Sequence, residues 1–289
     1  MIRRLMVRRY WGRALAEGRL RTWAAEPTVR RCLNRRVTGS PDVWPLEWFA
    51  AEIAEGPFPR ALSLGCGEGV LERDLMAKGL CGTVLGLDLS EQALALARQR
   101  AREAGHPGIA YERADLDRLR LEPGSYDAVF VHQALHHVRE LEACLGQAAG
   151  ALKAGGVLYA DEYVGPSRHE WRRELLAAAE AVFRELPAAA RARRRWRPLG
   201  GSLPLPVDWR DPSEAVRSSE IVPLIETLFE VRERRDYGGN LLAVIYPHLR
   251  LDALEPAARE EVLGLLLARE DELLASGVAS YYAVIVAGR

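Results

Sequence analysis

The sequence predicts an α/β fold built on a doubly wound seven-stranded, mostly parallel sheet. Three observations carry this prediction. A short apolar strand at 60–64 leads into a glycine-rich turn at 65–69, and after a helical segment a second apolar run ends at Asp88. Strand-like and helical segments then continue to alternate along the chain. A last segment, 280–287, is nearly all apolar, as is typical of a strand buried on both faces of a sheet.

Composition divides the chain into four regions. Residues 1–56 contain helical segments separated by prolines and are expected to form an N-terminal helical cap. Residues 57–163 alternate strand and helix as a cofactor-binding core does. A helical insertion at 164–228, between strands five and six, is predicted to act as a lid over the substrate. Residues 229–289 are expected to complete the core sheet.

The individual elements follow from periodicity and from start and stop signals. The second helix of the core has a clear start, because Ser90 precedes Glu91 and a serine hydroxyl accepts hydrogen bonds from the amides of a first helical turn. Strands are expected at 60–64, 82–88, 109–112, 126–132, 156–162, 229–236 and 280–287. Helices are expected at 70–78, 90–104, 138–151, 168–186 and 213–228, and between 240 and 276.

The glycine-rich turn predicts a site for a nucleoside cofactor. Gly65 and Gly67 allow backbone angles that other residues avoid, and they let a ligand lie against the main chain. The following helix points its N-terminal amides at that ligand. Asp88, at the tip of the second strand, is placed to accept hydrogen bonds from both ribose hydroxyls.

The details of the turn favour S-adenosylmethionine over a dinucleotide. The third glycine, Gly69, comes one position earlier than in the dinucleotide fingerprint, and Val70 fills the last position. Glu68 and Glu72 would repel an anionic pyrophosphate at the helix N-terminus, but not a ligand that carries a sulfonium charge. A nicotinamide-dependent oxidoreductase remains the alternative.

Five segments together resemble the motifs of class I S-adenosylmethionine-dependent methyltransferases. They occur in the order of that family and cover about residues 60–163. The resemblance implies that the last strand of the sheet is antiparallel and that the cofactor is S-adenosyl-L-methionine. It also implies methyl transfer to an acceptor by in-line displacement. The segments are 62–69, 86–90, 113–116, 126–138 and 152–158.

The resemblance assigns cofactor contacts residue by residue. Asp88 would bind the ribose, Leu89 would lie against the adenine, and Asp115 would read the adenine amino group. His132 would lie near the methyl group. The full set implied is Gly65, Cys66, Gly67, Glu68, Gly69, Asp88, Leu89, Asp115, Leu116 and His132.

Candidate catalytic residues follow strands four and five. His132, His136 and Glu162 are the expected choices for taking a proton from the acceptor. The alternative for the histidines, including His137, is packing or helix capping, and for Glu162 it is pairing with an arginine of the lid. No metal site is expected, because Asp161 and Glu162 are adjacent on a strand and point to opposite faces.

Composition limits the classes of partner. The 40 basic residues balance the 40 acidic ones, so no nucleic-acid or membrane partner is expected. The scattered cysteines, the absence of a long apolar run and the lack of a signal-peptide pattern indicate a cytoplasmic protein. The acceptor is expected to be a small molecule: a sugar, a nucleotide sugar or a secondary metabolite. A homodimer and a non-catalytic cofactor-binding partner protein are also considered.

Two further segments are candidates for substrate contacts. The basic run 191–197 has three interpretations: a solvated helix end and loop, a clamp for an anionic acceptor, or a contact with nucleic acid. In the N-terminal region, Tyr10, Trp23 and Asn34 are the expected residues at the mouth of the pocket.

Overall fold

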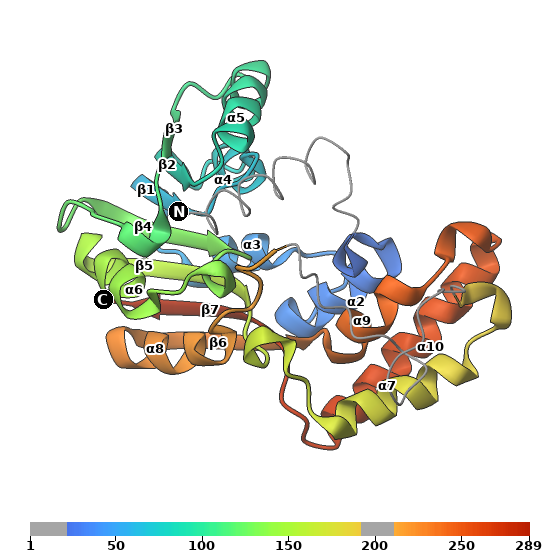
Figure 1. The fold of residues 1–289 in the computed structure, drawn as a ribbon. Helices are drawn as coiled ribbons and strands as arrows, with labels where there is room; N and C mark the ends of the chain where they lie inside the picture. The colour runs from blue at the N-terminus through green and yellow to red at the C-terminus, as the bar shows by residue number, and fades with distance from the viewer. Residues whose placement is uncertain (1–21, 192–210) are drawn as a thin grey trace.

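A seven-stranded sheet forms the centre of the protein. The computed structural model describes residues 22–191 and 211–289, and the strand order is β3-β2-β1-β4-β5-β7-β6 (Figure 1). Strands β1 to β5 are parallel, and β7 runs antiparallel to both β5 and β6. The predicted doubly wound sheet with an antiparallel last strand is therefore confirmed. The strands are β1 (Phe58–Leu64), β2 (Cys81–Asp88), β3 (Ile109–Arg113), β4 (Tyr126–His132), β5 (Leu152–Tyr163), β6 (Glu230–Gly238) and β7 (Tyr282–Gly288).

Helices cover both faces of the sheet. Side chains alternate along β4, so Phe130 packs with one core cluster and Val129 and Val131 pack with the other. Leu75 of α4 lies in the first cluster and Leu145 of α6 in the second. The helices are α2 (Pro27–Thr38), α3 (Pro45–Trp48), α4 (Val70–Ala77), α5 (Glu91–Glu103), α6 (Leu141–Ala151), α7 (Arg173–Glu185), α8 (Ile221–Leu228), α9 (Asn240–Ile245) and α10 (Pro256–Ala275).

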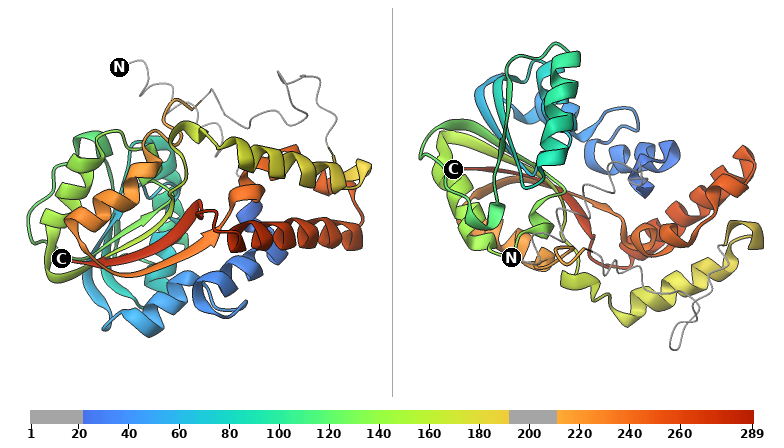
Figure 2. Two further views of the ribbon diagram at one scale, coloured as in Figure 1. Left: turned by 90° about the horizontal axis from the view of Figure 1, so that it is seen from below. Right: turned by 45° about the horizontal axis from the view of Figure 1, so that its top comes forward.

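A group of helices extends beyond one end of the sheet. Helix α9 contacts both α7 and α10, and α10 also contacts α2 (Figure 2). These helices come from three of the expected regions: the cap, the insertion and the C-terminal completion. Contacts between helices therefore cross the expected boundaries at 164 and 229.

Some elements differ from the sequence-based expectation in their bounds. Strand β5 begins at Leu152 instead of 156, and α6 begins at Leu141 instead of 138. The helix expected at 213–228 is shorter, because Ala215 has a φ of +47°, which a continuous α-helix does not allow. A short 3₁₀ helix, η7 (Ser218–Glu220), precedes α8 instead. Tyr10 and all but Arg191 of the basic run lie outside the described residues.

A buried ion pair between α2 and α10 connects the helices α2, α9 and α10 to the end of β6. Glu270 of α10 has no exposed side-chain surface, and its Oε1 lies 2.9 Å from Nη1 of Arg36 on α2. The same carboxylate accepts hydrogen bonds from the amides of Gly239 and Leu241 at the start of α9, at 2.7 and 2.9 Å. Arg36 also donates to the carbonyl oxygen of Tyr237, at the end of β6. Three helices and a strand therefore share this one contact.

Glu270→Gln is expected to lower the free energy of unfolding by about 3 kcal/mol, because it leaves the charge of Arg36 without its buried partner. Urea unfolding followed by circular dichroism measures the change. Asp271→Asn is the matched control, since Asp271 pairs with the same arginine but is 62% exposed. Its expected loss is below about 1 kcal/mol. Equal losses in the two variants would contradict the role given to Glu270.

Candidate active site

The glycine turn after β1 is tightly packed at Gly65 and open at Gly67. A Cβ atom at Gly65 would lie 2.3 Å from Cβ of Ala134, which follows β4. At Gly67, where φ is +51°, an added Cβ would meet nothing within 4 Å. The backbone at Gly67 is therefore accessible to a ligand, and the turn at Gly65 is held against the end of β4.

Asp88 connects this turn to the end of β2. Its Oδ2 accepts a hydrogen bond from the amide of Gly67 at 3.0 Å, and its Oδ1 accepts one from the amide of Ser90 at 2.7 Å. Burial raises the pKa of Asp88, although the two backbone hydrogen bonds act to lower it. Each carboxylate oxygen keeps a second lone pair. The open backbone at Gly67 beside these acceptors fits the ribose of a nucleoside cofactor.

The remaining residues expected at the cofactor surround the turn. Leu116 borders it, since its Cδ1 lies 4.0 Å from the position that a Cβ on Gly65 would take. Asp115 caps a 3₁₀ helix, η3 (Leu116–Arg118), by accepting from the amide of Asp117. Leu89 is half-buried, and Cys66 is buried, which raises the pKa of its thiol.

The two glutamates of the turn are not free charges, contrary to the expectation from the sequence. Glu68 pairs with Arg100, with 2.8 Å between Oε2 and Nη1. Glu72, in the first turn of α4, has 0% exposure, and neither of its carboxylate oxygens has a hydrogen-bond partner among the described residues. Burial raises the pKa of Glu72 to about 7. Repulsion of a pyrophosphate by these residues is thus a weaker argument than the sequence suggested.

Glu162, near the end of β5, is buried, and both of its carboxylate oxygens are hydrogen-bonded. Its Oε1 accepts from the amides of Ala134 and Leu135 at 2.6 and 2.7 Å. Its Oε2 lies 2.8 Å from Nδ1 of His136, in a second 3₁₀ helix, η4 (Leu135–His137). Burial acts to raise the pKa of Glu162, but the hydrogen bond from His136 and the two amides hold it below its ordinary value. Glu162 therefore fixes the turn that follows β4.

His132 and Asp161 form a more open pair beside that turn. The side chain of His132 is 54% exposed, and its Nε2 lies 3.6 Å from Oδ2 of Asp161. The other oxygen of Asp161 accepts from the hydroxyl of Tyr237 at 2.6 Å. Asp161 and Glu162 contact different groups on opposite faces of β5, as their adjacent positions predict.

A group of histidines and acids lies on the other side of Glu162. Glu214 lies near His136, His137 and His169, with nitrogen–oxygen distances between 3.6 and 3.9 Å. The sequence did not associate Glu214 with these histidines, because it lies far along the chain and no local pattern connects them. In the sequence, the adjacent histidines His136 and His137 were the feature that marked this part of the site.

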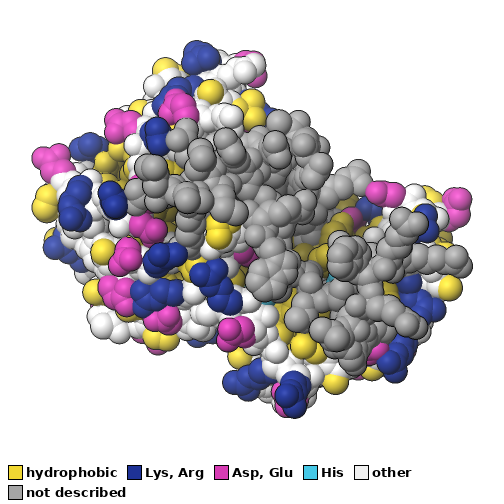
Figure 3. Space-filling view, in the orientation of Figure 1, with side chains coloured by type: hydrophobic (Ala, Val, Ile, Leu, Met, Phe, Trp, Pro, Cys, Tyr) yellow, Lys and Arg dark blue, Asp and Glu magenta, His cyan; other side chains and the backbone are white. Residues whose placement is uncertain are grey.

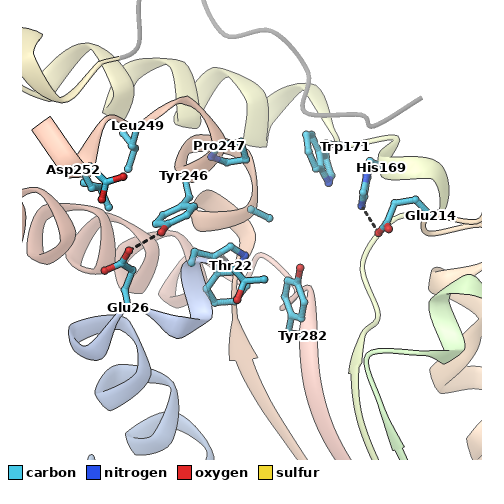
Figure 4. Close-up of a pocket in the computed structure, with 13 residues that line it drawn as sticks. Thr22, Glu26, His169, Trp171, Glu214, Tyr246, Pro247, Leu249, Asp252 and Tyr282 are labelled. Carbon is cyan, nitrogen blue, oxygen red and sulfur yellow. Dashed lines mark hydrogen bonds and ion pairs between the residues drawn. The ribbon is translucent and has the colours of Figure 1, made fainter. Parts of the chain in front are cut away.

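A cavity of about 460 Å³ opens next to this group (Figure 4). Five of its thirteen lining residues are aromatic, and Figure 4 shows Trp171 and His169 side by side, with Tyr282 below them. The expected Trp23 lines it, whereas Asn34 does not and instead donates to the carbonyl oxygen of Pro41. The lining residues are Thr22, Trp23, Glu26, His169, Trp171, Glu214, Ala243, Tyr246, Pro247, Leu249, Leu251, Asp252 and Tyr282.

The surface around the site carries mixed charge. On the face seen in Figure 3, basic and acidic side chains are interspersed among the described residues, in agreement with the balanced composition. None of the helices within 22–191 and 211–289 combines the length and the apolar character that crossing a membrane requires.

Comparison with known proteins identifies the central segment. Residues 62–160 match the methyltransferase domain family. Over 101 residues the chain is 36% identical to a ubiquinone biosynthesis O-methyltransferase of Paracidovorax citrulli, which covers 35% of this chain and 42% of that protein. The chain spans between 37 and 60% of the length of three curated relatives that it matches, this one among them.

Solved structures share the fold. Phosphoethanolamine N-methyltransferase 2 of Haemonchus contortus, in complex with S-adenosyl-L-methionine, has a TM-score of 0.51 at 16% identity, covering 92% of this chain and 58% of that one. A geranyl diphosphate methyltransferase in complex with sinefungin also has a TM-score of 0.51 at 16% identity, covering 82% and 73%.

The stability of the protein is expected to fall as the pH rises from about 4.5 to about 7, through the buried Glu72. Its pKa is about 7 in the folded chain against an ordinary value of 4.5. In this range the folded state keeps the proton and the unfolded state releases it, so unfolding is favoured by up to about 3 kcal/mol above pH 7. Urea unfolding at pH 5, 6, 7 and 8 measures the slope.

Glu72→Gln is expected to reduce this slope and to be more stable than the wild type at pH 8, because an amide has no proton to lose. Glu68→Gln serves as the control, since Glu68 lies in the glycine turn just before α4 but is partly exposed, and it should keep the wild-type slope. Parallel curves for the wild type and Glu72→Gln would refute this account.

Proposed function

We propose that this chain, whose residues 62–160 belong to the class I S-adenosylmethionine-dependent methyltransferase family, transfers a methyl group from that cofactor to a small-molecule acceptor. The hydrogen bond between the amide of Gly67 and Asp88 is the observation that carries the proposal. It joins the glycine turn to the acid at the tip of β2, within the segment that matches the family. Neither a fold likeness alone nor a glycine turn alone would support the same conclusion.

The cofactor would lie across the ends of β1 and β2. Asp88 would accept hydrogen bonds from the ribose, Leu89 and Leu116 would pack against the adenine, and the backbone at Gly67 would approach the ligand. When bound, S-adenosyl-L-methionine supplies a methyl group activated by a sulfonium leaving group. The chain then needs to align the acceptor and exclude water, more than to supply strong acid or base chemistry.

The acceptor would occupy the cavity beside β7. Its aromatic walls, which include Trp23, Trp171 and Tyr282, suit a planar or apolar molecule. The charged groups among its described lining residues are mainly carboxylates, from Glu26, Glu214 and Asp252. Such a lining disfavours phosphorylated acceptors and nucleotide sugars. The names of the relatives support a hydroxyl oxygen as the methylated atom.

His132 is the proposed base. It is exposed at the end of β4, and Asp161 lies 3.6 Å from its Nε2, on the side toward β5. Asp161 lies close enough to orient the ring, and the imidazole of His132 would take the proton that the acceptor hydroxyl gives up. Glu162 is a positioning residue instead, because each of its oxygens is already occupied by donors of the β4 turn.

Asp88→Ala is expected to weaken binding of S-adenosylhomocysteine by about 10- to 150-fold, since hydrogen bonds to a charged group contribute about 1.5–3 kcal/mol. Isothermal titration measures the affinity, with NADH as a second ligand. Asp127→Ala is the matched control, because Asp127 also accepts from a backbone amide, that of Arg60. Wild-type affinity in Asp88→Ala would refute the ribose assignment, and binding of NADH alone would favour an oxidoreductase.

His132→Asn is expected to lower kcat by about 100-fold, with the affinity for S-adenosylhomocysteine within about threefold of the wild type. Release of S-adenosylhomocysteine in a screen of hydroxyl-bearing aromatic acceptors measures turnover. His106→Asn, in the loop between α5 and β3, is the control and should be fully active. Equal losses in affinity and turnover would assign His132 a role in cofactor binding alone.

A further inference from the structure

We propose that His136, His137 and Glu214 bind one divalent transition-metal ion at the edge of the acceptor cavity. Each residue offers one ligand atom, and these three atoms all lie within 4.8 Å of one another. The ion-binding site is separate from the cofactor contacts at the glycine turn. Its existence does not depend on the proposed methyl transfer.

The distances between the ligand atoms suit a shared ion better than direct hydrogen bonds. Nε2 of His136 lies 3.9 Å from Oε1 of Glu214, and Nδ1 of His137 lies 3.9 Å from Oε2 of the same carboxylate. Both distances exceed the roughly 2.7–3.2 Å of a hydrogen bond. Ligands about 2.0–2.1 Å from a tetrahedral zinc ion lie about 3.4 Å apart. A shortening of about half an ångström would bring each of these two histidine–glutamate pairs to that spacing.

His136 is oriented for this role by Glu162. The carboxylate of Glu162 holds Nδ1 of His136 at 2.8 Å, so that the proton resides on that nitrogen and Nε2 presents its lone pair toward Glu214. Histidine ligands of metal ions commonly donate their second nitrogen to a carboxylate in this way. The amides of Ala134 and Leu135 fix the carboxylate in turn.

Asp211 adds an independent observation. Its side chain is 1% exposed, and its Oδ2 lies 3.9 Å from Nδ1 of His137. That oxygen has no hydrogen-bond partner among the described residues, whereas Oδ1 accepts from the amide and the hydroxyl of Ser213. A buried carboxylate oxygen directed at a histidine is costly to desolvate without a cation nearby. It would serve as a fourth ligand or balance the charge.

One contact must change when the ion binds. The hydroxyl oxygen of Ser213 lies 3.2 Å from Nδ1 of His137. Because that hydroxyl donates to Asp211, it accepts the proton of Nδ1 in the metal-free chain. Binding of an ion at Nδ1 would move this proton to Nε2 of His137 and break the contact with Ser213, because a ligating imidazole is neutral and carries its one proton on the other nitrogen.

The donor set indicates the class of ion. Two imidazoles and one or two carboxylates suit zinc and its neighbours in the first transition row, whereas magnesium and calcium prefer an all-oxygen set. Glu214 and His169 line the cavity, so the site opens toward the acceptor (Figure 4). If the proposed function is correct, the ion would bind an acceptor oxygen and lower the pKa of its proton.

The test uses the full chain, stripped with a chelator and then titrated with Zn²⁺. Metal content after dialysis and competition with a chromogenic chelator give stoichiometry and affinity. We expect one ion per chain in the wild type and at least tenfold weaker binding in Glu214→Gln and His137→Asn. His106→Asn is the control for binding at a surface histidine and should match the wild type. Co²⁺ loading should give visible d–d bands that are lost in the same two variants.

Glu214→Gln keeps the result interpretable, because its side chain is 28% exposed and the substitution conserves its shape. Near-ultraviolet circular dichroism and titration with S-adenosylhomocysteine check the fold of each variant. Zinc binding that is absent in the wild type, or unchanged in Glu214→Gln, would overturn the metal site. Intact binding of S-adenosylhomocysteine in the same samples would leave the proposed function standing.

Discussion

The arrangement of both halves of the candidate site depends on the buried carboxylate of Glu162. It accepts hydrogen bonds from two backbone amides and from the ring of His136, all within a single turn at residues 134–136. On the side of the glycine turn, it places Ala134 against Gly65, so that position 65 has no space for a side chain. Toward the cavity, it directs His136 at Glu214. A buried carboxylate is tolerable only because every oxygen has a donor.

Two neighbouring residues of β5, Asp161 and Glu162, contact different groups on opposite faces of the strand. Glu162 points to the turn after β4, while Asp161 points to Tyr237 and the exposed His132. The alternation of a β-strand produces this division without any insertion. Strands β5 and β7 are antiparallel. The pairing of Tyr163 with Tyr282 therefore brings the start of β7 to the edge of the sheet where β5 ends. An antiparallel strand thus contributes its first residues, and not its last, to the cavity.

The fold and the geometry of the glycine turn were predictable from the sequence because their signals are local. A strand, the turn at Gly65–Gly69 and the acid Asp88 lie within thirty residues of one another. The environment of Glu72 was not predictable, since burial depends on how α4 packs. The contacts of Glu214 with His136 and His137 join segments about 75 residues apart, and no periodicity reports them. The break at Ala215 escaped prediction because alanine seldom adopts a positive φ.

The walls of the cavity have a separate origin from the cofactor half. All thirteen lining residues lie outside the segment 62–160 that matches the family. If the cavity binds the acceptor, as proposed, mutations of its walls can reshape the acceptor pocket without changing any residue of the matched segment. Such a separation would let the matched segment stay constant while the residues around the cavity change. It also offers a route to engineering, in which exchange of the wall segments would redirect the enzyme to new acceptors.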